Sequence, residues 1–117
     1  MTDSNSTTSL PLEIDVVSVK EMLDQSADFL LLDCREPQEH ALCKIESAVL
    51  IPMNQTPDRI SELEDYRDRR IVVHCHLGMR SLQVAGWLRQ HGFDKAQNMS
   101  GGIEAWSLQI DVSVPRY

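Results

Sequence analysis

Short apolar runs of strand length alternate along this chain with stretches of helical character. Phe29–Asp33 and residues 71–74 are apolar runs without polar alternation, as expected for strands that are covered on both faces. Alternation of such strands with helices is typical of α/β domains. We therefore predict an α/β fold with an open, mainly parallel β-sheet of about five strands and helices on both faces.

The other predicted elements follow the same pattern. Further strands are expected at residues 14–17, residues 48–51 and Ala96–Met99. Ser18 with Glu21 resembles a capping box that starts a helix, and Thr56-Pro57 resembles an N-cap followed by a first-turn proline. We predict helices from residue 18, over Pro37–Leu42, over residues 56–63, over residues 81–91, and after Gly101-Gly102 through Trp106.

Composition limits the classes of partner. The chain has 117 residues and a formal net charge of −7, with acidic and basic residues interleaved. That balance disfavours binding to nucleic acid phosphates and to anionic membranes. Small molecules or proteins are the expected partners, and we expect a monomer.

The N-terminal residues are expected to lie outside the fold. Residues 1–11 are rich in Ser, Thr and Asn, and they lack the basic and hydrophobic regions of a secretory signal. We interpret residues 1–11 as a disordered lead-in and residues 12–117 as one domain. A cytoplasmic location is the default expectation, and there the cysteines should stay reduced.

The most informative segment surrounds Cys75, which stands where a predicted strand ends. Gly78 follows in the loop, and a helix is expected to begin near Arg80 or Ser81. A loop that turns into a helix N-terminus directs backbone N–H groups at one point and favours an anion there. The Cys75 thiol should therefore have a lowered pKa, with Arg80 as a nearby positive charge.

Two other interpretations of this segment are available. An isolated cysteine at a strand end is more often a small buried hydrophobe than a nucleophile. Three successive residues, His74, Cys75 and His76, could suggest a metal site, but neighbouring side chains in an extended segment point in opposite directions. We therefore expect no metal here, and the coincidence of strand, cysteine, glycine, arginine and helix start favours a reactive thiol.

The motifs resemble those of the rhodanese family. Cys75-His-Leu-Gly78-Met-Arg80-Ser81 resembles the family's active-site loop, and Asp33-Cys-Arg35-Glu resembles its Asp-x-Arg-Glu segment. Three further segments match in order and spacing: Ala48-Val-Leu-Ile-Pro52, Gly92-Phe93 and Gly101-Gly-Ile-Glu-Ala-Trp106. The resemblance extends from about Ile14 to the end of the chain.

This resemblance implies a sulfurtransferase. Cys75 would accept a sulfane sulfur from thiosulfate or a persulfide, hold it as a persulfide, and pass it to a thiophilic acceptor or a sulfur-carrier protein. The loop residues His76, Leu77, Gly78, Met79, Arg80 and Ser81 would surround the sulfur. Asp33 and Arg35 would support the site, either as a salt-bridge network or by binding substrate. No cofactor is implied.

Other functions remain as alternatives. A rhodanese-like binding or regulatory module without turnover is one, although such modules usually lack the cysteine. A cysteine-dependent phosphatase or arsenate reductase is another, but the related phosphatase loops enclose one residue more than the four between Cys75 and Arg80. The apolar Leu77 and Met79 suggest a protein or thiol partner rather than thiosulfate.

The sequence predicts different roles for the two other cysteines. Cys34 follows a predicted buried strand, so we expect it to pack as a small hydrophobe. Cys43 replaces a glycine that is common in the family, and a role for it as a second thiol that resolves the persulfide is a weaker alternative. The sequence leaves open whether either cysteine takes part in redox or sulfur relay.

Overall fold

The computed structural model describes residues 10–117 and contains one parallel sheet. Its strands are β1 (Glu13–Ile14), β2 (Phe29–Asp33), β3 (Val49–Leu50), β4 (Arg70–His74) and β5 (Ala96–Met99). They lie in the order β1-β5-β4-β2-β3, and all four strand pairs are parallel. The predicted α/β fold with about five strands is therefore confirmed.

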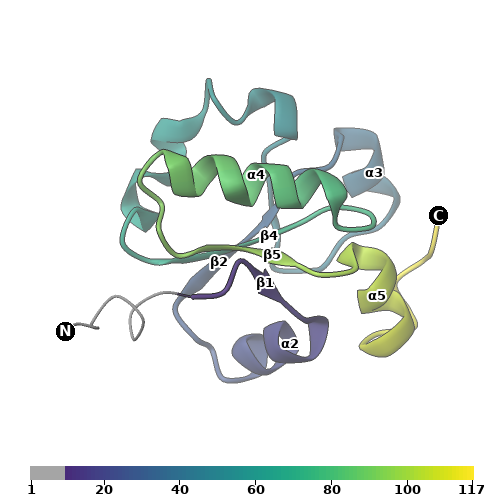
Figure 1. Ribbon diagram of the computed structural model, residues 1–117. Helices are drawn as coiled ribbons and strands as arrows, with labels where there is room; N and C mark the ends of the chain where they lie inside the picture. The colour runs from purple at the N-terminus through teal and green to yellow at the C-terminus, as the bar shows by residue number, and fades with distance from the viewer. Residues whose placement is uncertain (1–9) are drawn as a thin grey trace.

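Helices cover both faces of the sheet, as Figure 1 shows. Helices α2 (Val16–Asp24) and α5 (Gly102–Gln109) lie on one face. The other face is covered by α4 (Met79–Gln90) and by the 3₁₀ segments η1 (Met53–Gln55) and η2 (Ile60–Tyr66). Helix α3 (Pro37–Leu42) follows β2. Within residues 10–117, no helix is long and apolar enough to cross a bilayer.

The two faces have separate hydrophobic cores, and the central strands contribute to both. Leu31 and Val72 pack in the core beneath α2 and α5, whereas Leu32 and Val73 pack in the core beneath α4. Because both faces of β2 and β4 are buried, these strands carry apolar residues without polar alternation.

The register of β2 and β4 brings their carboxyl ends to the same edge. Asp33 is paired with His74, and the backbone pairing continues one residue further, because Cys34 N donates to His74 O at 3.1 Å. Ligands of open parallel sheets bind at this edge. The fold therefore places the segment after β2 beside the segment after β4.

Two predicted helix starts are wrong. Helix α2 begins at Val16 because the Asp15 side chain accepts a hydrogen bond from Ser18 N at 2.7 Å, so Asp15 is the N-cap in place of Ser18. Thr56 lies in the turn that follows η1, where its hydroxyl donates to Pro52 O at 3.3 Å. Residues 56–59 form turns, and the next helical segment, η2, begins at Ile60.

The predicted lead-in, residues 1–11, lies mostly outside the described residues. Its last two residues are described, and their carbonyl oxygens accept hydrogen bonds from Arg89 Nη2 at 2.8 and 3.0 Å. Where the domain begins stays a prediction.

The turn before α5 supports the loop that follows β4. Ile103 N donates to Cys75 O at 2.9 Å, and Glu104 N donates to His76 O at 3.1 Å. Gly102 adopts a φ of +61°, and a Cβ built there would lie 2.3 Å from His76 O. Only glycine allows α5 to approach the loop this closely.

We predict that Gly102→Ala destabilises the protein by about 3 kcal/mol or more, because the new methyl group collides with backbone that has little room to move. Urea unfolding followed by circular dichroism measures this. Gly86→Ala is the matched control: a Cβ there meets nothing within 4 Å, and alanine in a helix interior should stabilise by up to about 1 kcal/mol. Equal stability of the two variants would contradict this account of the turn.

Candidate active site

The sulfur of Cys75 lies inside a ring of hydrogen-bond donors. Gly78 N donates to Cys75 Sγ at 3.1 Å and Ser81 N donates at 3.4 Å. Ser81 Oγ lies 3.3 Å from the same sulfur. Gly78 is the N-cap of α4 with a φ of +105°, and this left-handed conformation turns the loop around the sulfur. The arrangement is a cradle for a negatively charged sulfur.

These contacts lower the pKa of Cys75 to about 4. The largest cause is a hydrogen bond from the Cys34 side chain; burial acts in the opposite direction, and the Ser81 side chain and the amides of Ser81 and Gly78 lower the pKa further. Cys75 is therefore a thiolate at neutral pH, and the thiolate is the nucleophilic form.

Asn98 in β5 holds the loop and was missed by sequence reasoning. Its Nδ2 donates to Gly78 O at 3.2 Å, and Ser81 Oγ donates to its Oδ1 at 2.5 Å. Because a hydroxyl has one proton, Ser81 Oγ can donate either to Asn98 or to Cys75 at a given moment. The signal available in the sequence was an amide side chain inside a predicted strand. If such a side chain is buried, it needs hydrogen-bond partners.

Arg80 is paired with Glu39 of α3. Its Nη1 and Nη2 donate to the two Glu39 carboxylate oxygens at 2.7 and 2.9 Å. These hydrogen bonds are the main cause that lowers the pKa of Glu39 to about 2. Arg80 was expected to be a positive charge near Cys75, and its pairing with Glu39 offsets that charge. Sequence reasoning missed Glu39, which is distant from Arg80 along the chain.

Arg35 and Asp33 form a fully buried ion pair. Arg35 Nε and Nη2 donate to the two Asp33 oxygens at 2.9 and 2.8 Å, and Nη2 also donates to Cys43 O at 2.6 Å. Both side chains have 0% exposure. Of the two interpretations, the geometry favours the salt-bridge network, because Arg35 presents no surface to a substrate.

The last residue, Tyr117, joins these groups. Its hydroxyl accepts from Arg35 Nη1 at 3.0 Å and donates to Glu39 Oε2 at 2.7 Å. Its ring stacks on His76, with ring centroids 3.9 Å apart. Figure 1 shows the chain leaving α5 toward α3 to reach this position. His76 is half-buried under this ring, and sequence reasoning missed Tyr117.

Two residues of the loop, Leu77 and Met79, are exposed, whereas His74 at the end of β4 is buried on the opposite face of the sheet from Cys75. Leu77 and Met79 are 57% and 71% exposed, so apolar side chains flank the entrance to the cradle. His74 points to the other face of the sheet, where its Nε2 is 4.0 Å from Asp33 Oδ1. Burial lowers the pKa of His74 and keeps it neutral. Among residues 10–117, no group of three or more His, Cys, Asp or Glu side chains converges as metal ligands would.

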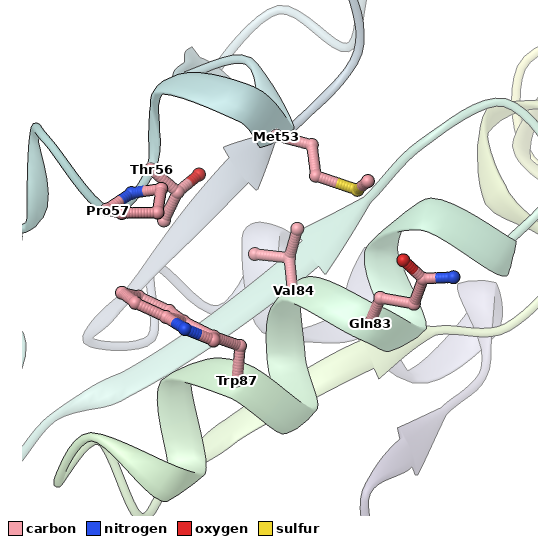
Figure 2. A pocket seen from close by; sticks show the side chains of 6 residues that line it. All are labelled: Met53, Thr56, Pro57, Gln83, Val84 and Trp87. Atoms are coloured by element: carbon pink, nitrogen blue, oxygen red, sulfur yellow. The ribbon is translucent and has the colours of Figure 1, made fainter.

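An apolar groove lies between η1 and α4, away from the cradle. Figure 2 shows its lining side chains, which come from the start of η1 and the turn after it and from the side of α4 that faces η1: Met53, Thr56, Pro57, Gln83, Val84 and Trp87. None of these side chains is an acid or base at neutral pH, and the Thr56 hydroxyl is engaged by Pro52 O at 3.3 Å with no base beside it among the lining residues. The chemistry therefore belongs to the Cys75 loop.

Comparisons with known proteins give one family match and several related sequences. The family model described as "Rhodanese-like domain" matches residues 15–109. A "Sulfurtransferase" of Allochromatium vinosum is 40% identical over 95 residues, covering 81% of this chain and 87% of that protein. "Rhodanese-like/PpiC domain-containing protein 12, chloroplastic" of Arabidopsis thaliana is 38% identical over 91 residues, covering 74% of this chain and 30% of that protein.

Solved structures have the same fold. The crystal structure of a rhodanese-like domain protein from Staphylococcus aureus matches with a TM-score of 0.74 and 29% identity. The match covers 92% of this chain and 99% of that one.

We predict that the ultraviolet absorbance of the Cys75 thiolate titrates with a midpoint at pH about 4, with Cys75→Ser as the reference. The thiolate should persist through neutral pH and be protonated only as the pH falls through this value. Ser81→Ala should raise the midpoint, because it removes one of the groups that stabilise the anion. A midpoint near the ordinary thiol value of about 8.5 would contradict the cradle.

We predict that Tyr117→Phe destabilises the protein by about 1–2 kcal/mol, because a buried nitrogen of Arg35 loses a hydrogen-bond partner while the ring can still stack. Urea unfolding measures the change. Arg116→Ala is the neighbouring control: Arg116 pairs with Glu104 at the surface, so its loss should have no measurable effect. If the two variants were equally stable, the phenol would not be a structural part of the network.

Proposed function

Because the chain belongs to the rhodanese-like domain family, we propose that it is a sulfurtransferase in which Cys75 carries the transferred sulfur as a persulfide. The observation that carries this proposal is the ring of donors around Cys75 Sγ, from Gly78 and Ser81, with a pKa of about 4 for that thiol. A stabilised thiolate is the nucleophile that such a transfer requires.

The reaction has two halves. In the first, the Cys75 thiolate attacks the outer sulfur of a donor, and the rest of the donor leaves with the electron pair of the broken bond. In the second, an acceptor thiolate attacks the outer sulfur of the Cys75 persulfide and regenerates the Cys75 thiolate. Both halves are displacements at sulfur, so no cofactor is needed.

The loop stabilises the negative charge in each state. In the free enzyme, the charge is on Cys75 Sγ and the amides of Gly78 and Ser81 stabilise it. In the persulfide, the charge moves to the outer sulfur, which the loop amides after Cys75 would surround. This is the same principle by which backbone amides stabilise an oxyanion.

The surroundings of the cradle favour thiol-based donors over thiosulfate. A sulfonate group is best bound by an unpaired guanidinium, but Arg80 is held by Glu39 and Arg35 by Asp33. The exposed rim residues Leu77 and Met79 offer apolar contact instead. We infer that the donor is a persulfide of a small thiol or of a protein, and that a sulfur-carrier protein is a fitting acceptor.

Intact mass spectrometry tests the proposal. After incubation with glutathione persulfide, the wild-type chain should gain about 32 Da, one sulfur atom. Cys75→Ser should gain nothing, because it lacks the accepting thiolate. Cys43→Ser should gain the same mass as wild type, because Cys43 lies in the core on the other face of the sheet. Thiosulfate should load the chain more slowly than glutathione persulfide.

Two outcomes would count against this function. One is the absence, with both donors, of the adduct and of any change in mass or release of sulfide, which would remove the sulfurtransferase assignment. The other is equal loading of wild type and Cys75→Ser, which would place the sulfur on a different residue.

A further inference from the structure

A second cysteine lies directly beside Cys75. Cys34 follows β2 and Cys75 follows β4, and the preceding residues Asp33 and His74 are paired in register. The hydrogen bond from Cys34 N to His74 O, 3.1 Å long, extends the pairing to Cys34. Paired strands are about 4.8 Å apart, and disulfides join Cα atoms about 4.4–6.8 Å apart. The backbone therefore places the two cysteines at a separation that a disulfide can span.

Both side chains also point to the same face of the sheet. Alternation along β2 and β4 puts Leu32 and Val73 in the core beneath α4, and two residues further, Cys34 and Cys75 lie in that same core. The Cys34 side chain is also the largest cause of the lowered pKa of Cys75. Cys43 belongs to the opposite core.

Burial determines which groups can reach the inner sulfur of a persulfide. Cys34 and Cys75 are 0% and 1% exposed. In the persulfide, the outer sulfur occupies the side from which the donor approached, so an external thiol meets the outer sulfur before Cys75 Sγ. Among residues 10–117, Cys34 is the only thiol that shares the core of Cys75.

We propose that Cys34 is a resolving thiol that displaces the sulfane sulfur from Cys75 as hydrosulfide when no acceptor arrives, leaving a Cys34–Cys75 disulfide. This inference rests on the proposed function, because it begins from the Cys75 persulfide. It adds a second outcome for that intermediate: sulfide is released, and Cys75 is blocked reversibly as a disulfide.

The step balances without an external oxidant. Cys34 sulfur forms a bond to Cys75 Sγ, and the bond from Cys75 Sγ to the outer sulfur breaks. The electron pair of that bond leaves with the outer sulfur, which also takes the proton of the Cys34 thiol and departs as hydrosulfide. Cys34 is thereby oxidised and the sulfane sulfur is reduced. Two equivalents of a small thiol then return the disulfide to two thiols.

Persulfide formation changes the position of the negative charge near Cys34, and this change favours loss of the Cys34 proton. In the free enzyme, the adjacent Cys75 thiolate raises the pKa of Cys34 and keeps it protonated. Persulfide formation moves the negative charge one atom outward, so this effect on Cys34 weakens. The outer sulfur then carries the charge that accepts the Cys34 proton. Loading therefore removes one of the causes that keep Cys34 protonated, while burial of Cys34 still raises its pKa.

The test follows the fate of the loaded sulfur in three proteins: wild type, Cys34→Ser and Cys43→Ser. Serine at residue 34 keeps a hydroxyl donor toward Cys75 but cannot form a disulfide. Each protein is loaded with glutathione persulfide, desalted rapidly and held without an acceptor, while intact mass and free sulfide are recorded. Peptide mapping locates any disulfide.

Wild type and Cys43→Ser should lose the adduct of about 32 Da, end about 2 Da below the reduced mass, and release one sulfide per chain. In both, the disulfide should join Cys34 and Cys75. Cys34→Ser should keep the adduct at least about tenfold longer and release no stoichiometric sulfide.

Two results would overturn the inference while leaving the proposed function standing: equal adduct lifetimes in wild type and Cys34→Ser, or a disulfide that maps to Cys43. Failure of the wild-type chain to load any sulfur would instead contradict the proposed function, and with it this inference. The loading step in wild type therefore separates the two.

Discussion

The register between β2 and β4 determines which residues of the segment after β2 lie beside Cys75. Pairing of Asp33 with His74 places the carboxyl ends of both strands at one edge of the sheet. A slip of one residue would turn each side chain of one strand to the opposite face. Cys34 would then leave the core it shares with Cys75, and Asp33 would no longer point to the face where His74 lies. The apolar side chains on both faces of the two strands oppose such a slip, because each face is buried against its own helices.

The buried pair of Asp33 and Arg35 is the second constraint. Removing one partner of such a pair typically costs about 3–5 kcal/mol, because an uncompensated charge stays in the interior. Through Tyr117 and Glu39 this pair is connected to Arg80, so the segment after β2, helix α3, the active-site loop and the end of the chain form one polar network. The two arginines expected near the sulfur therefore act as parts of the framework, and backbone amides supply the positive potential.

The central strands and the Cys75 loop could be predicted because their signals are local, whereas the strand predicted at residues 14–17 is wrong from Val16, where α2 begins. The apolar run Phe29–Asp33 has strand length, and the glycine after Cys75 marks a turn into a helix. The start of α2 was misplaced because Asp15 and Ser18 are both good caps, and only the path of the chain decides between them. Glu39 and Tyr117 could not be found in this way, since their partners lie far along the sequence. Cys34 was expected to be a small buried hydrophobe; its burial is confirmed, but the strand order that brings it beside Cys75 was not available from sequence.

The bonds between α5 and the active-site loop have a consequence for how the site responds to charge. The carbonyl oxygens of Cys75 and His76 are held by the amides of Ile103 and Glu104, so these peptide groups are anchored on the α5 side and cannot rotate to present a carbonyl to the sulfur. The dipoles around the sulfur are therefore oriented before any donor arrives. In water, by contrast, the solvent molecules around the sulfur would have to reorient each time the negative charge moved between Cys75 and the outer sulfur. This reorientation would add to the activation energy. In the anchored loop, folding has already oriented the dipoles, so this contribution to the activation energy is small.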